Sequence, residues 1–409
     1  MIREQLKEAK KACRFMQNVK PEVKNKALKN ISEALIQKSE LIIQENQKDI
    51  AEAKNNGIKE SMVDRLLLNK ERIEAMAKDI LKVIDLQDPI GTLVREIKRP
   101  NGLVIQQIRI PLGVIGVIYE SRPNVTVDIA SLCIKTNNVC VLKGGKEAIH
   151  SNRILVQIIN EAIQDVLPTH TVTLIETKKR EETLDLIQAH DYVDVIIPRG
   201  SAGLIQYVVK NATVPVIETG AGICHLYVDQ DASLDMALEI AKNAKIQRPS
   251  VCNAIETILV HQKVAPEFLP KLQELFKNVQ IYGDEKTRKI IDCLEATEKN
   301  YATEYDDYIC NIKVVDDIEE AIEHIYNYST KHSESIITEN KETAKYFMES
   351  LDSACVYHNA STRFSDGGQF GFGAEVGIST QKLHARGPLG LQEITSTKYM
   401  IYGNGQVRS

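Results

Sequence analysis

The sequence contains no apolar run that approaches the roughly 20 residues needed to span a bilayer as a helix. It also has no excess of positive charge, since the formal net charge of the 409-residue chain is −5. These two absences argue against a membrane protein and against a nucleic-acid-binding protein. The charged N-terminal segment MIREQLKEAKKACRFM lacks the apolar stretch of a secretion signal. We therefore expect a cytoplasmic protein.

Several familiar motifs are missing as well. The eight cysteines are scattered with no CxxC pair, which argues against a disulfide framework and fits a reducing compartment. No HExxH or other common zinc spacing occurs, so we expect no metal site. The GxGxxG fingerprint and the P-loop are absent, although GFGAEVG misses the first by one position. On motifs alone, nucleotide binding stays open.

The N-terminal part of the chain predicts helices followed by a hairpin. Over about the first 90 residues, apolar side chains recur at helical spacing. Residues 92–112 then alternate apolar and polar side chains on both sides of Asn101-Gly102, a strong hairpin signal. A hairpin this far from other strands can pair with another chain.

Two regions of alternating strands and helices follow. In the first, from Gly113 to about Val228, the predicted strands are GVIGVIYE, NVCVLKGG, HTVTLIE, YVDVIIPRG and VPVIETG. The second ends near Cys355, and the segment NASTRFSDGGQFGFGAEVG after it is typical of an ordered loop near a site. The alternation indicates parallel sheets that bind ligands at the carboxyl ends of their strands.

The stretch IQRPSVCNAIETILV places Cys252 between a proline-broken helix end and an apolar strand. Free cysteines are usually buried packing residues. Here Pro249 and Ser250 put the thiol in a connection, and Arg248 supplies positive charge, which lowers a thiol pKa. These residues leave a nucleophile and a packing cysteine as equal alternatives.

Three more polar residues follow predicted strands, and each has two interpretations. Glu218 is either a base near a site or an N-cap. Asn124 is either an amide donor to an oxyanion or an N-cap. Lys143 ends a strand, where it meets either a phosphate or ribose or only solvent.

Taken together, these residues resemble a known superfamily. Four of them have the type and order found in aldehyde dehydrogenases: Asn124, Lys143, Glu218 and Cys252. QRPSVCNA, Val315 to Ile336 and Asn359 to Tyr399 resemble motifs of one of its families, the γ-glutamyl phosphate reductases. The similarity covers nearly the whole chain.

The resemblance implies an α/β fold with two Rossmann-like parallel-sheet domains and a bridging oligomerisation hairpin. Residues 1–91 and 113–223 would bind NADPH, and residues 224–385 would form the catalytic domain, with Cys252 facing the cleft between them. Residues 92–112 and 386–409 would bridge to a partner chain in a homodimer or higher homo-oligomer.

The implied activity is the NADPH-dependent reduction of L-glutamyl 5-phosphate to L-glutamate 5-semialdehyde with release of phosphate, in proline biosynthesis. The Cys252 thiolate would form a thioester, and the Asn124 side chain and the Cys252 backbone N–H would hold the oxyanion. The chain shows no kinase domain, so another protein, glutamate 5-kinase, would make the acyl phosphate and contact this enzyme transiently.

The resemblance also assigns binding residues. The expected cofactor contacts are Lys143 at the adenosine ribose or its phosphate, Arg199, Gly200 and Ser201 at the pyrophosphate, and Glu304 at the nicotinamide ribose. Arg199 would also help to select the extra phosphate of NADPH. The implied substrate ends in an α-amino acid, so the site needs groups for a carboxylate and an ammonium. We expect Arg363, assisted by Ser361 and Thr362, to bind the carboxylate, the alternative being that NASTRF only shapes the loop, and Asp128 to bind the ammonium.

Two alternative functions stay open. In hydrolytic aldehyde dehydrogenases the glutamate that matches Glu218 activates water, so a hydrolytic dehydrogenase is the second interpretation, and phosphate dependence separates the two. In a phosphate-dependent enzyme Glu218 would orient groups or relay protons. A non-enzymatic protein on the same fold is the third interpretation, and it predicts a blocked nucleophile and no NADPH binding.

Overall fold

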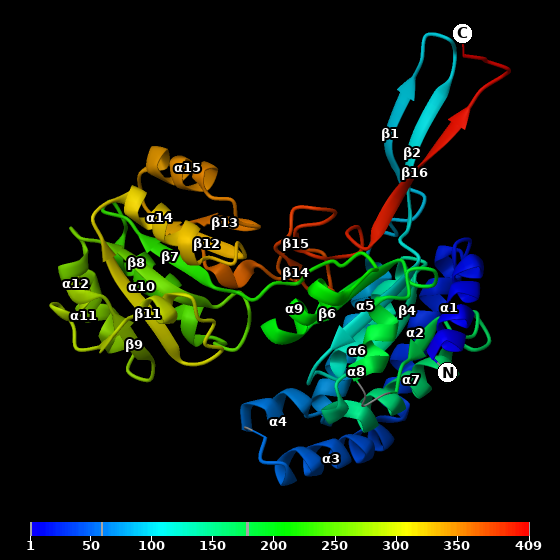
Figure 1. Ribbon diagram of the computed structural model, residues 1–409, viewed down its shortest axis with the longest axis horizontal. Helices are drawn as coiled ribbons and strands as arrows, with labels where there is room; N and C mark the ends of the chain where they lie inside the picture. Colours follow the sequence, from blue (N-terminus) through cyan, green and yellow to red (C-terminus); the bar gives the residue numbers. More distant parts are fainter. Residues whose placement is uncertain (1, 59, 177–179, 409) are drawn as a thin grey trace. The chain divides into compact units, whose positions relative to one another are not determined.

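The computed structural model describes residues 2–58, 60–176 and 180–408, and the chain divides into two compact units. Unit 1 comprises Met1–Thr219, Gly371–Gly377 and Leu389–Ser409, and unit 2 comprises Gly220–Phe370 and Ile378–Pro388 (Figure 1). The segment 371–377 therefore belongs to unit 1, whereas the sequence assigned it to the catalytic domain. Within the described ranges, no helix is both long and apolar enough to cross a membrane.

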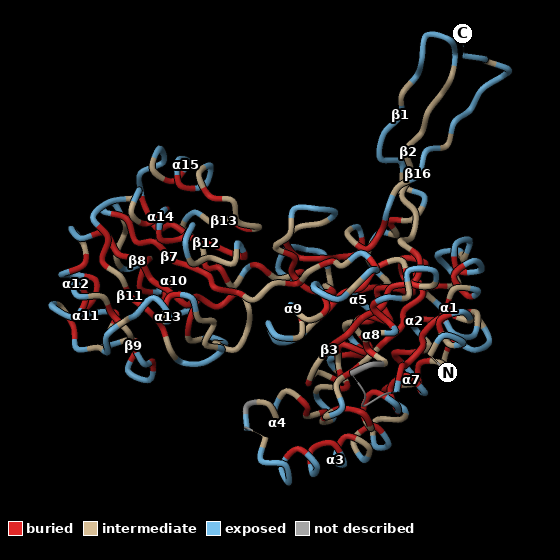
Figure 2. Tube along the Cα trace, viewed as in Figure 1, coloured by how far each residue is buried: buried red, intermediate tan, exposed pale blue. Residues whose placement is uncertain are grey.

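Unit 1 contains a parallel sheet of four strands in the order β5-β4-β3-β6. All six residues of β3 are buried, as expected for a parallel strand that is covered on both faces (Figure 2). The four strands are β3 (Val114–Tyr119), β4 (Val139–Gly144), β5 (Val172–Leu174) and β6 (Val195–Arg199).

The predicted fifth strand at VPVIETG forms only a short pairing beside β6. Val216 bridges Ile196 in parallel, the Ile196 N–H donates to the Pro215 carbonyl at 2.8 Å, and the Ile217 N–H donates to the Ile196 carbonyl at 2.9 Å. Pro215 has no N–H to donate, and the N–H groups of Thr213 and Val214 both donate to the Ile187 carbonyl instead. This segment is therefore a connection that leads out of unit 1.

Helices surround this sheet. In α1, Leu6, Ala9, Cys13 and Met16 are buried at helical spacing, as the periodicity predicts. The helices of unit 1 are α1 (Ile2–Met16), α2 (Pro21–Gln37), α3 (Ser39–Asn55), α4 (Glu60–Leu66), α5 (Lys70–Asp85), α6 (Asn124–Lys135), η1 (Lys146–Ala148), α7 (Ile149–Ile163), α8 (Arg180–Ile187) and α9 (Ala202–Asn211).

A three-stranded antiparallel sheet also belongs to unit 1. The strands β1 (Leu93–Lys98) and β2 (Val104–Pro111) form the predicted hairpin, with Gly102 at φ +90° in its turn. The other edge of β2 pairs with β16 (Thr395–Tyr402), from the C-terminal tail, over eight residue pairs. The three strands stand clear of the helices (Figure 1).

Unit 2 contains a seven-stranded parallel sheet in the order β10-β9-β11-β8-β7-β12-β13. All seven residues of the central strand β8 are buried. The strands are β7 (Cys224–Val228), β8 (Ile255–His261), β9 (Gln280–Gly283), β10 (Leu294–Glu295), β11 (Ile309–Val315), β12 (Ser333–Ile337) and β13 (Cys355–His358).

Helices and a small second sheet complete unit 2. The strands β14 (Ile378–Ser379) and β15 (Gly387–Pro388) form an antiparallel pair. The helices are α10 (Leu234–Ile246), α11 (Ala265–Leu275), α12 (Glu285–Arg288), α13 (Glu298–Tyr301), α14 (Ile318–Tyr328), α15 (Lys341–Ser350) and η2 (Thr362–Phe364).

A buried ion pair ties the two elements that flank the Cys252 connection. Lys245 lies in the last turn of α10 and Glu256 at the start of β8, with Nζ 2.8 Å from Oε2. Both side chains are almost fully buried. Burial raises the pKa of Glu256 to about 8, although Lys245 opposes the shift. The pair therefore fixes the spacing between helix and strand at the cost of desolvating two charges.

We expect Lys245→Met to destabilise unit 2 by about 3–5 kcal/mol, because it leaves the Glu256 carboxylate buried without its cation. Urea unfolding followed by circular dichroism measures the loss. The double variant Lys245→Met, Glu256→Gln removes both charges and should recover most of it. A double variant no more stable than the single one would contradict this account.

Candidate active site

Cys252 lies half-buried in the connection between α10 and β8. The N–H of Ala254 donates to the carbonyl of Val251 at 2.9 Å, so Cys252 and Asn253 are the two central residues of a tight turn. The Cys224 thiol donates to the Cys252 carbonyl at 3.2 Å. The placement in a connection agrees with the sequence, and the thiol lies in a turn whose backbone is held.

Gly222 lies directly behind this turn. A Cβ on Gly222 would overlap the carbonyl oxygen and carbon of Cys252, so only glycine fits there. The Gly222 N–H donates to Oε1 of Glu304 at 2.7 Å. Glu304, the predicted nicotinamide-ribose residue, therefore lies beside the backbone that supports the predicted nucleophile, a link with no signal in the sequence.

Arg363 lies close to the same turn. Its Nε donates to Oε1 of Gln247 at 3.1 Å, and its Nη1 donates to Oδ1 of Asn253. Burial lowers the pKa of Arg363, the nearby Arg248 lowers it further, and Asp366 and Cys252 raise it. Arg363 thus interacts electrostatically with Cys252, and a positive charge near a thiol favours the thiolate in general.

Ser361 and Thr362, predicted to assist substrate binding, are buried and form internal contacts. Ser361 Oγ accepts from the Arg363 N–H at 3.2 Å, and Thr362 Oγ1 donates to the Asn253 carbonyl at 2.7 Å. Gln247 and Asn253 were missed in the sequence, although both stand in QRPSVCNA. Their amides give no signal of a contact with residues over one hundred positions away.

Asn124 and Asp128 lie together in α6 of unit 1. As Asn124 Nδ2 donates to Asp128 Oδ2 at 2.9 Å, one oxygen of the predicted ammonium-binding carboxylate is occupied. Burial raises the pKa of Asp128 to about 6, while the Asn124 bond and Arg199 oppose the shift. By accepting this bond, the Asp128 carboxylate orients the Asn124 amide.

Arg199 points toward a segment from far along the chain. Its Nη1 donates to the carbonyl of Val376, and an added Cβ on Gly377 would lie 3.1 Å from this nitrogen. Glu218, the other uncertain residue, is half-buried in the connection between α9 and β7. The predicted roles of Arg199 and Glu218 stay predictions.

A cavity of about 600 Å³ lies in unit 1 at the carboxyl ends of β3 and β4 and at the N-terminus of α9. It is lined by Ile118, Tyr119, Glu120, Lys143, Gly145, Lys146, Glu147, Thr183, Ser201, Gly203, Leu204 and Tyr207. This is the edge of a parallel sheet where nucleotides bind.

The charged groups of this cavity suit a nucleotide. Burial lowers the pKa of Lys143, and the carboxylates of Glu147 and Glu120 oppose the shift. The Ser201 N–H at the N-terminus of α9 donates to Glu120 at 2.8 Å. An added Cβ on Gly200 would lie 2.5 Å from the same carboxylate. A helix N-terminus that already receives a carboxylate is suited to an anionic group such as a phosphate.

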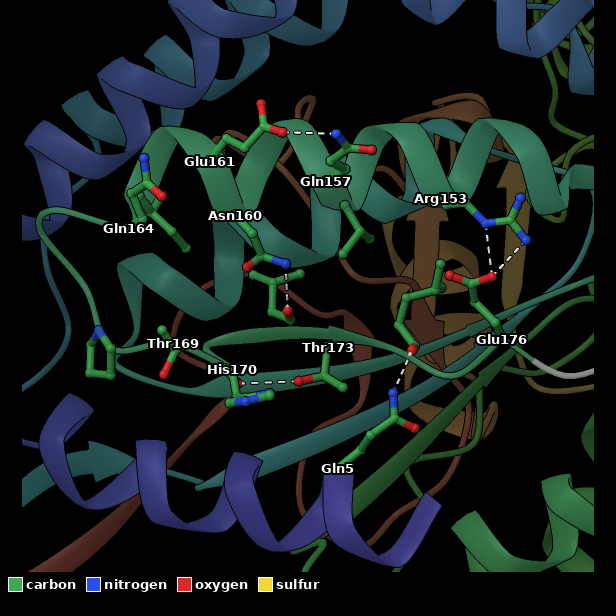
Figure 3. A pocket seen from close by; sticks show the side chains of 15 residues that line it. Gln5, Arg153, Gln157, Asn160, Glu161, Gln164, Thr169, His170, Thr173 and Glu176 are labelled. Carbon is green, nitrogen blue, oxygen red and sulfur yellow. Dashed lines mark hydrogen bonds and ion pairs between the residues drawn. The ribbon is translucent and has the colours of Figure 1, made fainter. Parts of the chain in front are cut away.

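A second cavity of about 630 Å³ lies between α7 and β5. Several of its polar side chains bond to one another or to backbone carbonyls (Figure 3). Asn160 Nδ2 donates to the Val172 carbonyl at 3.1 Å, and Gln5 Nε2 donates to that of Leu174 at 3.4 Å. These bonds block the edge strand from further pairing, so we assign this cavity a structural role.

Comparison with known proteins identifies the family. The model of the aldehyde dehydrogenase family matches residues 1–291. Gamma-glutamyl phosphate reductase from Petrotoga mobilis is 55% identical over 405 residues, which covers 98% of this chain and 97% of that protein. The same enzyme from Halothermothrix orenii is 53% identical over 408 residues, covering 99% and 98%. This chain belongs to the γ-glutamyl phosphate reductase family.

Solved structures agree. Gamma-glutamyl phosphate reductase from Thermotoga maritima is 48% identical, with a TM-score of 0.97 over 99% of both chains. An acetylating aldehyde dehydrogenase from Geobacillus thermoglucosidasius shares the fold, with a TM-score of 0.74 at 16% identity over 100% of this chain and 97% of its own. The predicted family and α/β fold class are confirmed, and the family membership supports an oxidoreductase that uses a nicotinamide cofactor.

We expect Gly222→Ala to slow the alkylation of Cys252 by iodoacetamide, because the new Cβ displaces the Cys252 carbonyl. The alkylation rate follows the thiolate fraction and the access to the sulfur, and both change when this turn moves. Mass spectrometry of the Cys252 peptide measures the alkylation rate. Gly203→Ala, whose Cβ meets no atom within 4 Å, is the matched control. Equal rates for both variants would contradict the predicted role of Gly222.

Proposed function

We propose that this chain reduces L-glutamyl 5-phosphate to L-glutamate 5-semialdehyde, with release of phosphate and NADPH as hydride donor, in proline biosynthesis. The observation that carries the proposal is the position of Cys252, in a turn backed by Gly222 with Arg363 close by, in a chain of this family. A packing cysteine needs neither a supporting glycine nor a guanidinium.

In the proposed reaction the Cys252 thiolate attacks the acyl carbon of the substrate. A thioester bond forms, the bond between the acyl carbon and the phosphate oxygen breaks, and phosphate leaves. NADPH, when bound, supplies the hydride that reduces the thioester carbon. The carbon–sulfur bond then breaks, the thiolate of Cys252 is restored, and the aldehyde leaves.

The negative charge on the acyl oxygen needs donors. We assign this role to the Asn124 amide and the Cys252 backbone N–H, since loss of one such donor typically costs about 10²–10³ in rate. Asp128 supports the assignment because it accepts one N–H of the Asn124 amide at 2.9 Å and so restricts where the other N–H points. This carboxylate is also the proposed partner of the substrate ammonium.

The cavity of unit 1 is the proposed site of NADPH. Lys143 would contact the adenosine ribose or its phosphate, and Gly200 and Ser201 would hold the pyrophosphate at the N-terminus of α9. Arg199 would meet an anionic group while donating to Val376, which its five N–H groups permit. Glu304 would bind the nicotinamide ribose.

Arg363 is the proposed partner of the substrate carboxylate. Its Nε and Nη1 already donate to Gln247 and Asn253, which orients the guanidinium, and the guanidinium has further N–H groups for a carboxylate. Ser361 and Thr362 would assist by holding the Arg363 backbone and the Asn253 carbonyl.

A hydrolytic dehydrogenase is the second candidate. The observation that favours it is the presence of Glu218, half-buried in the connection between α9 and β7. In that reaction Glu218 would activate a water molecule that cleaves the thioester, and inorganic phosphate would not be needed. In the phosphate-dependent reaction the carboxylate has no water to activate.

We also propose that the chain forms a homodimer or a higher homo-oligomer through β16. Of the described strands in this sheet, β16 is at one edge, and it exposes Tyr399, Ile401 and Tyr402. Ile401→Lys should lower the mass measured by sedimentation velocity, while Tyr346→Lys, an exposed apolar site on α15, should not. A wild-type monomer would contradict the proposal.

The same measurement with glutamate 5-kinase added tests for the proposed transient contact.

The phosphate dependence of the reverse reaction tests the function. Glutamate 5-semialdehyde and NADP are mixed at alkaline pH, with and without inorganic phosphate, and NADPH is followed by absorbance. We expect turnover that requires phosphate, is lost in Cys252→Ala, and is slower with NAD. Formation of NADPH without phosphate would favour the hydrolytic dehydrogenase and make Glu218 the suspected base.

A further inference from the structure

We propose that Asn253 is a positioning residue: its amide and carbonyl, bonded to the turn at residues 362–365, set where the Cys252 sulfur lies. This inference rests on the proposed function only in taking Cys252 as the nucleophile. It concerns a residue that touches neither the thiol carbon nor a substrate group, and it explains why a polar side chain is buried directly after the nucleophile.

All the described hydrogen bonds of Asn253 to this turn have a defined direction. Nδ2 donates to the carbonyls of Ser365 at 2.8 Å and Arg363 at 3.4 Å, and Oδ1 accepts from Nη1 of Arg363. The Asn253 carbonyl accepts from Thr362 Oγ1 at 2.7 Å. A flipped amide would place its NH₂ against the guanidinium, so a single orientation satisfies every partner.

The surroundings of Asn253 leave little freedom. Its side chain is only 4% exposed, so a bond lost here is not replaced by bulk water. On the other side of the turn, Gly222 and the Cys224 thiol contact the Cys252 carbonyl. The peptide that joins Cys252 to Asn253 is therefore held from two sides, and the sulfur can move mainly by rotation about the Cα–Cβ bond of its own side chain.

The turn that holds Asn253 is itself anchored to the sheet of unit 2. Ser365 Oγ lies 2.5 Å from Ser333 Oγ in β12 and 2.7 Å from the Tyr357 hydroxyl in β13. The hydroxyl of Ser365 is thus held by two parallel strands, and the carbonyl of Ser365 in turn holds the Asn253 amide next to the proposed nucleophile. A site whose supporting residues are locked in this way keeps its reacting atom in place.

Arg363 bonds to both ends of the connection that contains Cys252. By donating to both Gln247 and Asn253, it spans the connection from the end of α10 to the residue after Cys252. Loss of these bonds would loosen the turn even without substrate. A guanidinium that only bound the substrate carboxylate would have no effect on the free enzyme. The two roles therefore differ in a measurable way.

The rate of Cys252 alkylation by iodoacetamide in the substrate-free enzyme, measured across pH with peptide mapping, tests this inference. Thr362→Val removes the hydroxyl bond to the Asn253 carbonyl at nearly constant volume, and we expect it to slow alkylation several-fold, because a displaced sulfur loses part of the positive charge of Arg363 that favours its thiolate. Thr362→Ser keeps the hydroxyl and should restore most of the rate. In both variants kcat should follow the alkylation rate.

Two further variants test the same bonds at other residues, so that the inference can still be tested if Thr362→Val fails to fold. Asn253→Asp keeps the acceptor for Arg363 but sets a carboxylate oxygen against the Ser365 carbonyl, and it should slow alkylation as Thr362→Val does. Gln247→Ala is at an exposed position and removes one anchor of Arg363, so it should fold and slow alkylation several-fold. Wild-type alkylation in the folded variants would overturn the inference.

The outcomes also separate this inference from the proposed function. Variants that alkylate normally, in an enzyme whose turnover requires phosphate, would overturn the role of Asn253 and leave the function standing. Slow alkylation in the variants of an enzyme without phosphate-dependent turnover would support Asn253 as a positioning residue and overturn the function.

Discussion

The contact between the Gly222 backbone and the Cys252 carbonyl is the constraint on which the candidate nucleophile depends. It requires a residue without a side chain at position 222, and it brings the start of β7 against the turn before β8. The Cys224 thiol and the Glu304 carboxylate bond to the same small region. One close backbone approach therefore places the nucleophile next to the residue predicted to bind the nicotinamide ribose.

Charge is used differently in the two units. In unit 2 the buried pair Lys245 and Glu256 fixes the ends of the Cys252 connection, while Arg363 remains half-buried beside the thiol. In unit 1 burial raises the pKa of Asp128, which accepts the Asn124 amide. The pair Lys245 and Glu256 is thus almost fully buried, whereas Asp128 and Arg363, the charges proposed to bind substrate, are only partly buried.

Local patterns in the sequence predicted much of the fold. The alternation of apolar strands with helices identified both parallel sheets, and Asn101-Gly102 identified the hairpin, because these signals depend on near neighbours. The pairing of β16 with β2 joins residues almost three hundred positions apart, and no local pattern encodes it. VPVIETG pairs with β6 only briefly, because the Val214 N–H donates to the Ile187 carbonyl instead, a bond that no local pattern encodes.

The candidate site shows the same division. Cys252 was recognisable because proline, arginine and a strand surround it in sequence, whereas the bond from Arg363 to Asn253 exists only after folding.

The central claim is that Cys252 carries the acyl group. The most direct test mixes glutamate 5-semialdehyde and NADP without phosphate, quenches rapidly in acid and maps the peptides by mass spectrometry. We predict a glutamyl group on the peptide that contains Cys252. An unmodified Cys252 peptide, or a glutamyl group on another cysteine, would contradict the account.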